Sequence, residues 1–238
     1  FGTSAGAVVN ASVKSGTNQF HGSLYANTRN QSLTRTQPYL TDFSQQQYSA
    51  SLGGLIMKDE LFFFVTGEMQ QLQTPATGAF VGGPDPVVTQ ASIDGLNNIM
   101  ATQYNYTEAG SGAQVQRDNP NRNLFARVDA YLPYNTRLVL RHNYSGADNT
   151  SFSRSAGTSN NPNFNLTSYQ YEFSSKTNSS VAEFLTNLSS GVYNELLLNY
   201  STTKDFRTVP THFPLVTVQG IPRESGTGTA NFVFGTEN

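Results

Sequence analysis

Residues 123–144 read NLFARVDAYLPYNTRLVLRHNY, and this stretch decides the fold class. Apolar and polar side chains alternate along both halves, which is the period of a β-strand with two different faces. Pro133-Tyr134-Asn135 separates the halves with residues typical of a turn. The apolar faces carry Leu124, Ala126, Val128, Ala130 and Leu132, and then Leu138, Leu140, His142 and Tyr144. The stretch therefore predicts a β-hairpin with one wet face.

Five further segments are predicted strands. They are residues 20–27, 48–57, 61–71, 166–188 and 192–206. Within the fourth segment, Tyr171 and Phe173 have the opposite parity to Phe184 and Leu188, which predicts a β-bulge between Phe173 and Phe184. Shorter strands are expected at residues 5–14 and 215–218.

The connections between these strands alternate strictly in length. Those after residues 28, 71, 148 and 206 are long, whereas those at 58–60, 133–135 and 189–191 are short. An up-and-down membrane barrel with short periplasmic turns and long extracellular loops has this pattern. We therefore predict an all-β chain that forms part of a large antiparallel transmembrane β-barrel.

One short helix interrupts the β pattern in the long connection 72–120. Residues 89–104 place apolar side chains at helical spacing, with Thr89 or Ser92 as the N-cap. The apolar side chains are Ile93, Leu96, Ile99 and Met100. Residues 110–121 are expected to be a loop.

The composition excludes several classes of function. Charged residues are 13% of the chain, there is no cysteine, and the formal net charge is −2. Disulfide frameworks, thiolate zinc sites and cysteine nucleophiles are thus excluded, and no basic stripe indicates nucleic acid. Aromatic residues, all Tyr and Phe, reach 12%, which argues against disorder. The sequence has no run of about 18 apolar residues, so no transmembrane helix is predicted.

No pattern of residues predicts a catalytic, metal or cofactor site, and we expect the chain not to be an enzyme. His21, His142 and His212 lack the spacing of a metal site. The loop carboxylates Asp85, Asp118 and Asp148 lack the spacing of a Ca²⁺ loop, and the letters GTSAG at 2–6 lack the strand-to-helix turn of a nucleophile elbow. The glycines at 53–54, 82–83 and 225–229 lack a P-loop ending. Ligand-binding residues are unknown.

Residues 1–28, FGTSAGAVVNASVKSGTNQFHGSLYANT, resemble the plug-to-barrel junction of TonB-dependent receptors. The closest pattern is that of the Oar-like branch, which carries a carboxypeptidase-regulatory-like domain and the motif G-x-V-N-x-x-T-K-S-G-T-N-x-F-H-G-S. Val13 replaces the usual Thr. The junction residues that match are Lys14, Ser15, Gly16, Thr17, Asn18, Phe20, His21 and Gly22. Further similarities lie in SLGG at 51–54, KDELFFF at 58–64, NLFARVD at 123–129 and NEL at 194–196.

This resemblance implies a domain division. Residues 1–17 would be the last strand of the plug, and 18–238 the N-terminal part of a barrel of about 22 strands. About seven strands would lie in this chain, with long extracellular loops near 29–45, 72–120, 149–165 and 207–238. Both ends of the sequence suggest a segment of a longer protein.

The resemblance also implies a location and partners. The chain would lie in the outer membrane of a Gram-negative bacterium, in contact with outer-membrane lipid, and would use the TonB complex through plug residues outside it. The luminal charges of Arg127, Asp129, Arg137 and Arg141 would contact the plug or line a ligand path. Two alternatives remain open. One is a non-transporting barrel for adhesion or assembly with other outer-membrane or surface proteins, and the other is a soluble β-sandwich.

Overall fold

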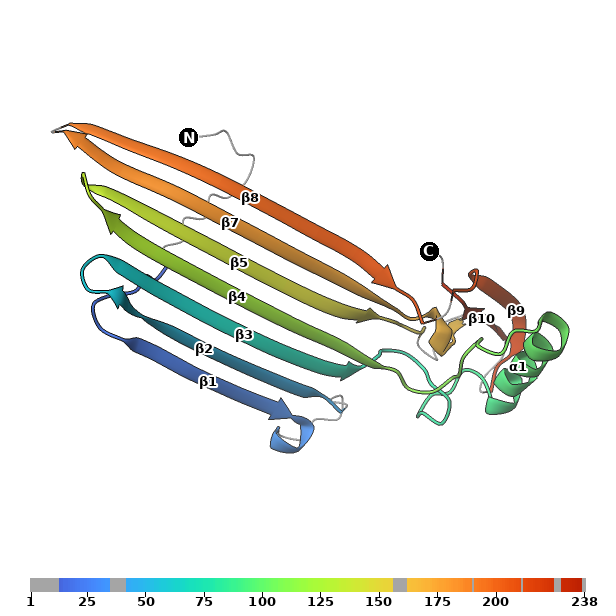
Figure 1. Ribbon diagram of the computed structural model, residues 1–238. Helices are drawn as coiled ribbons and strands as arrows, with labels where there is room; N and C mark the ends of the chain where they lie inside the picture. Colours follow the sequence, from blue (N-terminus) through green and yellow to red (C-terminus); the bar gives the residue numbers. More distant parts are fainter. Residues whose placement is uncertain are drawn as a thin grey trace.

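The computed structural model describes residues 13–34, 42–155, 162–189, 191–210, 212–224 and 228–236. Most of them form one open sheet of seven long antiparallel strands (Figure 1), and every strand pairs with its neighbour along the chain. The strands are β1 (His21–Asn30), β2 (Ser44–Met57), β3 (Leu61–Pro75), β4 (Gln116–Leu132), β5 (Thr136–Ser151), β7 (Tyr171–Ser189) and β8 (Val192–Thr208). This order, β1-β2-β3-β4-β5-β7-β8, is the up-and-down meander that the sequence predicts.

The cross-strand register sorts the side chains of the sheet into two faces. Asp129 pairs with Phe62 on β3 and Val139 on β5, so odd positions of β4 and β5 share what we call the polar face. Leu124 pairs with Tyr144, so even positions share the opposite face, which we call the belt face. The predicted hairpin of residues 123–144, with its apolar side chains together, is confirmed.

Apolar side chains on the belt face form a band that does not extend along the whole strand. The band ends at Met69 on β3, Leu124 on β4, Tyr144 on β5 and Tyr200 on β8. Beyond these residues the same face is mostly polar, with Phe206 on β8 as the aromatic exception. A tilted strand crosses the hydrocarbon core with ~9–11 residues. β7 and β8 have 19 and 17 residues, so both continue well past the band.

The band is exposed, as a lipid-facing surface requires. Leu124, Leu140, Leu196 and Leu198 are 43–55% exposed, and no second layer covers them among the described residues. The closed core that a soluble β-sandwich would build from these residues is therefore absent. Exposure of leucine on this scale is costly in water and favourable in lipid.

Three tight turns lie at one end of the sheet and connect β2 to β3, β4 to β5, and β7 to β8 (Figure 1). Asp59, Tyr134, Asn135 and Gly191 adopt positive φ in these turns. Short polar residues and glycine tolerate this conformation best, which explains the turn chemistry at these positions. Tyr134 is the exception, and its side chain is fully in solvent at 92% exposure.

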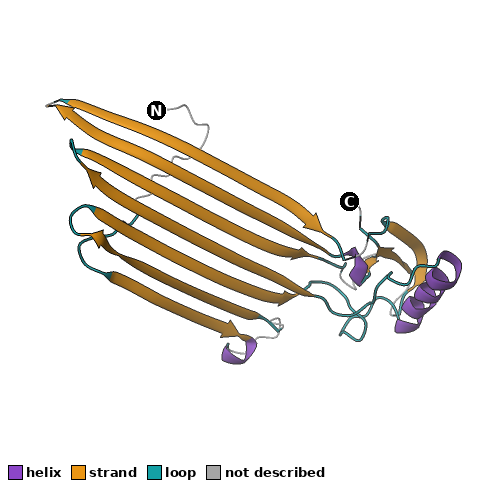
Figure 2. Cartoon of the chain, in the orientation of Figure 1, coloured by secondary structure: helices purple, strands orange, loops and turns teal. Residues whose placement is uncertain are grey.

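The opposite end of the sheet carries a separately packed unit, which we call the cap. The cap combines parts of three long connections, and Figure 2 shows one helix and short strands joined by loops. Its elements are α1 (Gln90–Tyr104), β6 (Asn163–Asn165), the 3-10 helix Thr167–Tyr169, β9 (Val216–Pro222) and β10 (Thr229–Phe234). The strands form a second sheet in the order β6-β10-β9, in which β10 is parallel to β6 and antiparallel to β9.

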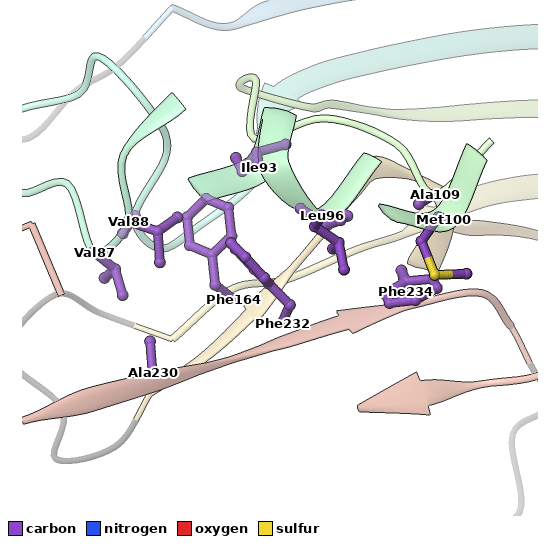
Figure 3. Close-up of a cluster of buried hydrophobic side chains, with 12 residues drawn as sticks. Val87, Val88, Ile93, Leu96, Met100, Ala109, Phe164, Ala230, Phe232 and Phe234 are labelled. Carbon is purple, nitrogen blue, oxygen red and sulfur yellow. The ribbon is translucent and has the colours of Figure 1, made fainter. Parts of the chain in front are cut away.

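The hydrophobic core of the protein lies in the cap (Figure 3). Phe164, Phe232 and Phe234 project from the small sheet toward Ile93 and Leu96 on α1, and all five side chains are at least 92% buried. Val87, Val88, Met100, Ala109, Leu166, Ala230 and Ala79 complete this cluster. The three connections therefore pack as one body.

The predicted helix is confirmed, with Thr89 as its N-cap: the Thr89 hydroxyl accepts from the Ser92 amide at 3.1 Å. Ile99, predicted on its apolar face, is instead 52% exposed. A further 3-10 helix, Gln31–Leu33, lies in the first long connection.

Four expectations are corrected by the structure. β7 pairs with β5 without a shift from Tyr171 to Thr186, so the bulge predicted between Phe173 and Phe184 is wrong. β4 begins at Gln116, so the second half of the loop predicted at 110–121 is strand. β5 runs to Ser151, and the connections 149–165 and 207–238 contain β6, β9 and β10. Of the strand predicted at residues 5–14, Val13 and Lys14 are not in a strand, and the rest lies outside the described residues.

Candidate functional site

The segment just before β1 lies against the polar face near the tight-turn end. Arg127 on β4 donates from Nη1 to the Val13 carbonyl oxygen at 3.1 Å, across 114 positions of sequence. Asn18 makes a two-sided contact with the turn between β2 and β3: its Nδ2 donates to Asp59 Oδ1, and its Oδ1 accepts from the Asp59 amide at 2.9 Å. These contacts fix both ends of residues 13–18 to the sheet.

Glycines allow this close approach. A Cβ on Gly16 would lie 2.3 Å from the Phe63 carbonyl oxygen and 2.5 Å from that of Gly54, which is shorter than any side chain tolerates. Any other residue at position 16 would therefore displace the segment. The glycine of the KSGTN motif is explained by this packing against the backbones of β2 and β3.

The SLGG and FHG motifs fit each other across the β1–β2 pair. A Cβ on Gly53 would meet the His21 ring at 3.0 Å, and one on Gly54 would meet the Phe20 ring at 2.4 Å. The His21 ring also stacks on Phe64, with ring centroids 6.4 Å apart. The two glycines thus leave room for one aromatic ring on each face of the sheet.

Five charged residues gather on the polar face beside the junction segment. Asp129, which is 1% exposed, accepts from Arg127 Nε at 2.7 Å and from Arg137 Nη2 at 2.7 Å. Arg141 donates to Glu183 on β7 at 3.3 Å. The Nε atoms of Arg137 and Arg141 are buried and have no hydrogen-bond partner among the described residues. The hydrogen-bonding capacity of the cluster is therefore not fully used within the described part of the chain.

The cap is held together by one buried arginine. Arg154 is 7% exposed and donates to the carbonyl oxygens of Asn165 at 2.6 Å and Ala113 at 2.7 Å, and of Gly112 and Ser111 at 3.2 Å. Its guanidinium lies over the rings of Phe152 and Phe164, 4.9 and 4.6 Å from their centroids. Burial lowers the pKa of Arg154 to about 10, which leaves the group charged at neutral pH.

The junction residues predicted from the sequence are brought together, with different roles. Five of them pack or hydrogen-bond at β2 and its turn: Gly16, Asn18, Phe20, His21 and Gly22. A Cβ on Gly22 would lie 2.8 Å from the Ser51 carbonyl oxygen. Thr17 closes a local turn, accepting from the Gln19 amide at 3.3 Å. The Lys14 side chain is exposed and that of Ser15 is partly buried, and neither has an assigned contact.

The candidate metal residues are separated in the fold. His21 lies on β1 against Phe64, His142 contacts Ser180 on the belt face at 2.8 Å, and His212 precedes β9. Asp118 and Asp148 accept hydrogen bonds from Gln71 and Ser174. No group of three or more potential metal-ligating residues occurs within the described ranges. The GTSAG letters at 2–6 fall outside those ranges.

Sequence reasoning missed Asp59 and Arg154. Asp59 could be found only by pairing Asn18 with a turn 41 residues away. Arg154 stands in a polar stretch, SFSRS, with no pattern that predicts burial. No helix in the described part of the chain has the length and apolar character needed to span a membrane.

Comparison with known proteins gives two matches. Residues 12–118 match the family described as "Outer membrane beta barrel domain". A relative named "TonB-dependent transporter Oar", from Myxococcus xanthus, is 41% identical over 75 residues, which cover 27% of this chain and 7% of the relative. No solved structure matches the chain significantly. Residues 12–118 are thus similar to an outer-membrane β-barrel domain, a 75-residue stretch shares partial homology with this transporter, and neither match is to an enzyme family.

Proposed function

We propose that this outer-membrane barrel chain is the plug-to-barrel junction and first wall of a TonB-dependent transporter that takes up a ligand. The observation that carries the proposal is the seating of residues 13–18 against the polar face, through Arg127 and the turn at Asp59. A segment that enters the sheet from its polar side fits a plug inside the lumen. Partial homology to a TonB-dependent transporter supports the same function.

The two faces of the sheet support a wall between lipid and lumen. The belt face would contact outer-membrane lipid, and the polar face would line the lumen around the plug. Because β1 and β8 each leave one edge without a partner among the described strands, further strands are needed to close a barrel, which we infer to have about 22 in total.

The buried charge cluster gives the polar face a role in holding the plug. Arg127 already joins the junction segment to Asp129, and the free Nε atoms of Arg137 and Arg141 would meet polar groups of the plug. The TonB complex would act on plug residues outside this chain. The cap would lie at the cell surface, where it would receive the ligand.

A cysteine labelling experiment in cells tests transport without knowledge of the ligand. Ser179 on β7 faces the polar side, between Asn143 and Ser201, whereas its neighbour Asn178 is exposed on the belt face beyond the apolar band. In the full-length protein, labelling of Ser179→Cys by a maleimide reagent should speed up when TonB and the proton gradient are active. Asn178→Cys should label at one rate throughout.

The outcomes separate the two functions. If the labelling rate of Ser179→Cys changes neither on deletion of TonB nor on addition of an uncoupler, the result would contradict transport. It would favour the second candidate, a non-transporting barrel that displays its loops for adhesion or assembly. The packed cap is the observation that favours this candidate, because a rigid surface suits a stable protein partner.

A further inference from the structure

A row of basic side chains crosses the belt face where the apolar band ends. The register pairs Arg122 on β4 with Gly146 on β5, Gly146 with Lys176 on β7, and Lys176 with Lys204 on β8. The three cations therefore occupy one lateral row of the sheet. No acidic side chain stands in that row, and we call it the basic row.

No ion pair between the described residues neutralises the charges of the basic row. Lys176 and Lys204 are direct cross-strand neighbours, and like charges in that position repel. The nearest carboxylate on this face, Asp148, accepts from the Ser174 hydroxyl at 2.6 Å. Lys176 lies over the Phe206 ring at 5.0 Å, a contact that leaves its charge in place.

The row lies at the height of a lipid headgroup. On β8, Lys204 follows the last band residue, Tyr200, by four residues, which is roughly 10 Å along the membrane normal for a strand tilted by about 40°. On β5, the Tyr144 hydroxyl reaches toward Gly146, since a Cβ there would lie 2.6 Å from it. Tyrosines that direct their hydroxyl outward from an apolar band mark the membrane interface.

We propose that the basic row binds the phosphate groups of a phosphorylated glycolipid in the outer leaflet, of the lipid A class. Two adjacent lysines and a nearby arginine match the charge of a phosphate-bearing headgroup, and an anion between Lys176 and Lys204 removes their repulsion. The choice of leaflet rests on the proposed orientation, in which the long connections are extracellular. Lipid binding by the basic row does not require that the protein transports a ligand.

The test uses the full-length protein in lipid nanodiscs. Binding of bisphosphorylated lipid A, fully dephosphorylated lipid A and phosphatidylglycerol is measured by native mass spectrometry for wild type and for the Lys176→Gln/Lys204→Gln double variant. A lysine near an anionic surface contributes about a fivefold gain in affinity, so the double variant should bind phosphorylated lipid A about thirtyfold more weakly. Lys58→Gln, at the tight-turn end, should bind as wild type does.

Three results would overturn the proposal: equal binding by the double variant, equal binding of the dephosphorylated lipid, or tighter binding of phosphatidylglycerol. Both lysines are exposed, so their replacement should leave the fold intact, and the Ser179→Cys labelling rate checks this in the same variants. That labelling also distinguishes failure of the lipid site from failure of transport. TonB-dependent labelling with no lipid preference would refute only the lipid site.

Discussion

Replacement of Arg154 by methionine should loosen the cap and leave the seven-stranded sheet unchanged. The guanidinium donates to four backbone carbonyl oxygens that come from two connections. Hydrogen bonds to charged groups contribute about 1.5–3 kcal/mol each, so the four provide about 6 kcal/mol at the low end of that range. Burial of the charge, which lowers the pKa of Arg154 from 12.5 to about 10, opposes them by about 3 kcal/mol.

The expected net loss is therefore about 3 kcal/mol, which raises the opening equilibrium of the cap about 150-fold. Hydrogen exchange of the full-length protein in nanodiscs measures this directly. Amides of α1 and β10 should exchange faster by that factor, while amides of β3 to β5 should not change. Arg154→Lys should give exchange rates between those of wild type and Arg154→Met, because one ammonium group cannot reach four carbonyls.

Arg207→Met is the matched control. Arg207 lies over the Tyr171 ring at 4.4 Å but is exposed, so its loss should change cap exchange less than tenfold. Unchanged exchange in Arg154→Met would refute the argument that this residue holds the two connections together. Equal acceleration throughout the chain would show that cap and sheet unfold as one unit.

Three further changes test the sheet and the junction. Gly16→Val should displace the junction segment, because its Cβ would lie 2.3 Å from the Phe63 carbonyl oxygen. Trypsin should then cleave faster after Lys14. Ser15→Val, the control, should not change the cleavage rate. Asp129→Asn should lower the free energy of unfolding in urea by about 3 kcal/mol, since it leaves two partly buried arginines without their carboxylate partner. Asp205→Asn on the same face should be neutral, and equal losses would contradict the role of the cluster. Leu140→Arg on the belt face should lower the free energy of unfolding in vesicles by about 2–4 kcal/mol, but Leu197→Arg on the polar face should be tolerated. The reverse result would show that the polar face, and not the belt face, contacts lipid.

The parts of the fold that the sequence predicts are those that cross the apolar band. Between residues 123 and 144 one face must be apolar and the other polar, so the period of two is visible and the hairpin follows. The tight turns are equally visible, since positions such as Gly191 and Asn135 carry residues that tolerate positive φ.

Beyond the band the signal disappears for a physical reason. Residues 116–122 of β4 are polar on both faces and include Pro120, so they look like a loop although they pair along their length. In β7, Tyr171 and Phe173 lie on the polar face near the cap, whereas Phe184 lies on the belt face. A regular strand that passes from one environment to the other thus shows the same change of parity in its apolar residues as a strand with a bulge.

The cap and the junction contacts depend on pairings that no local pattern encodes. Phe164 and Phe232 meet across 68 positions, and β6 is only three residues long, too short for alternation to be recognised. The junction residues were predictable only through resemblance to a family. Their contacts explain the motif afterwards: Gly16 for close approach and Asn18 for the turn at Asp59.

The central claim is that this sheet is a membrane wall with lipid on the belt face and a filled lumen on the polar face. Spin labels placed singly at residues 123–130 of β4 in the full-length protein, reconstituted in vesicles, test it most directly. Collision with oxygen, which concentrates in lipid, should be high at 124, 126, 128 and 130 and low at the four odd positions, in a strict period of two. Equal accessibility at both sets, or the opposite phase, would contradict the account.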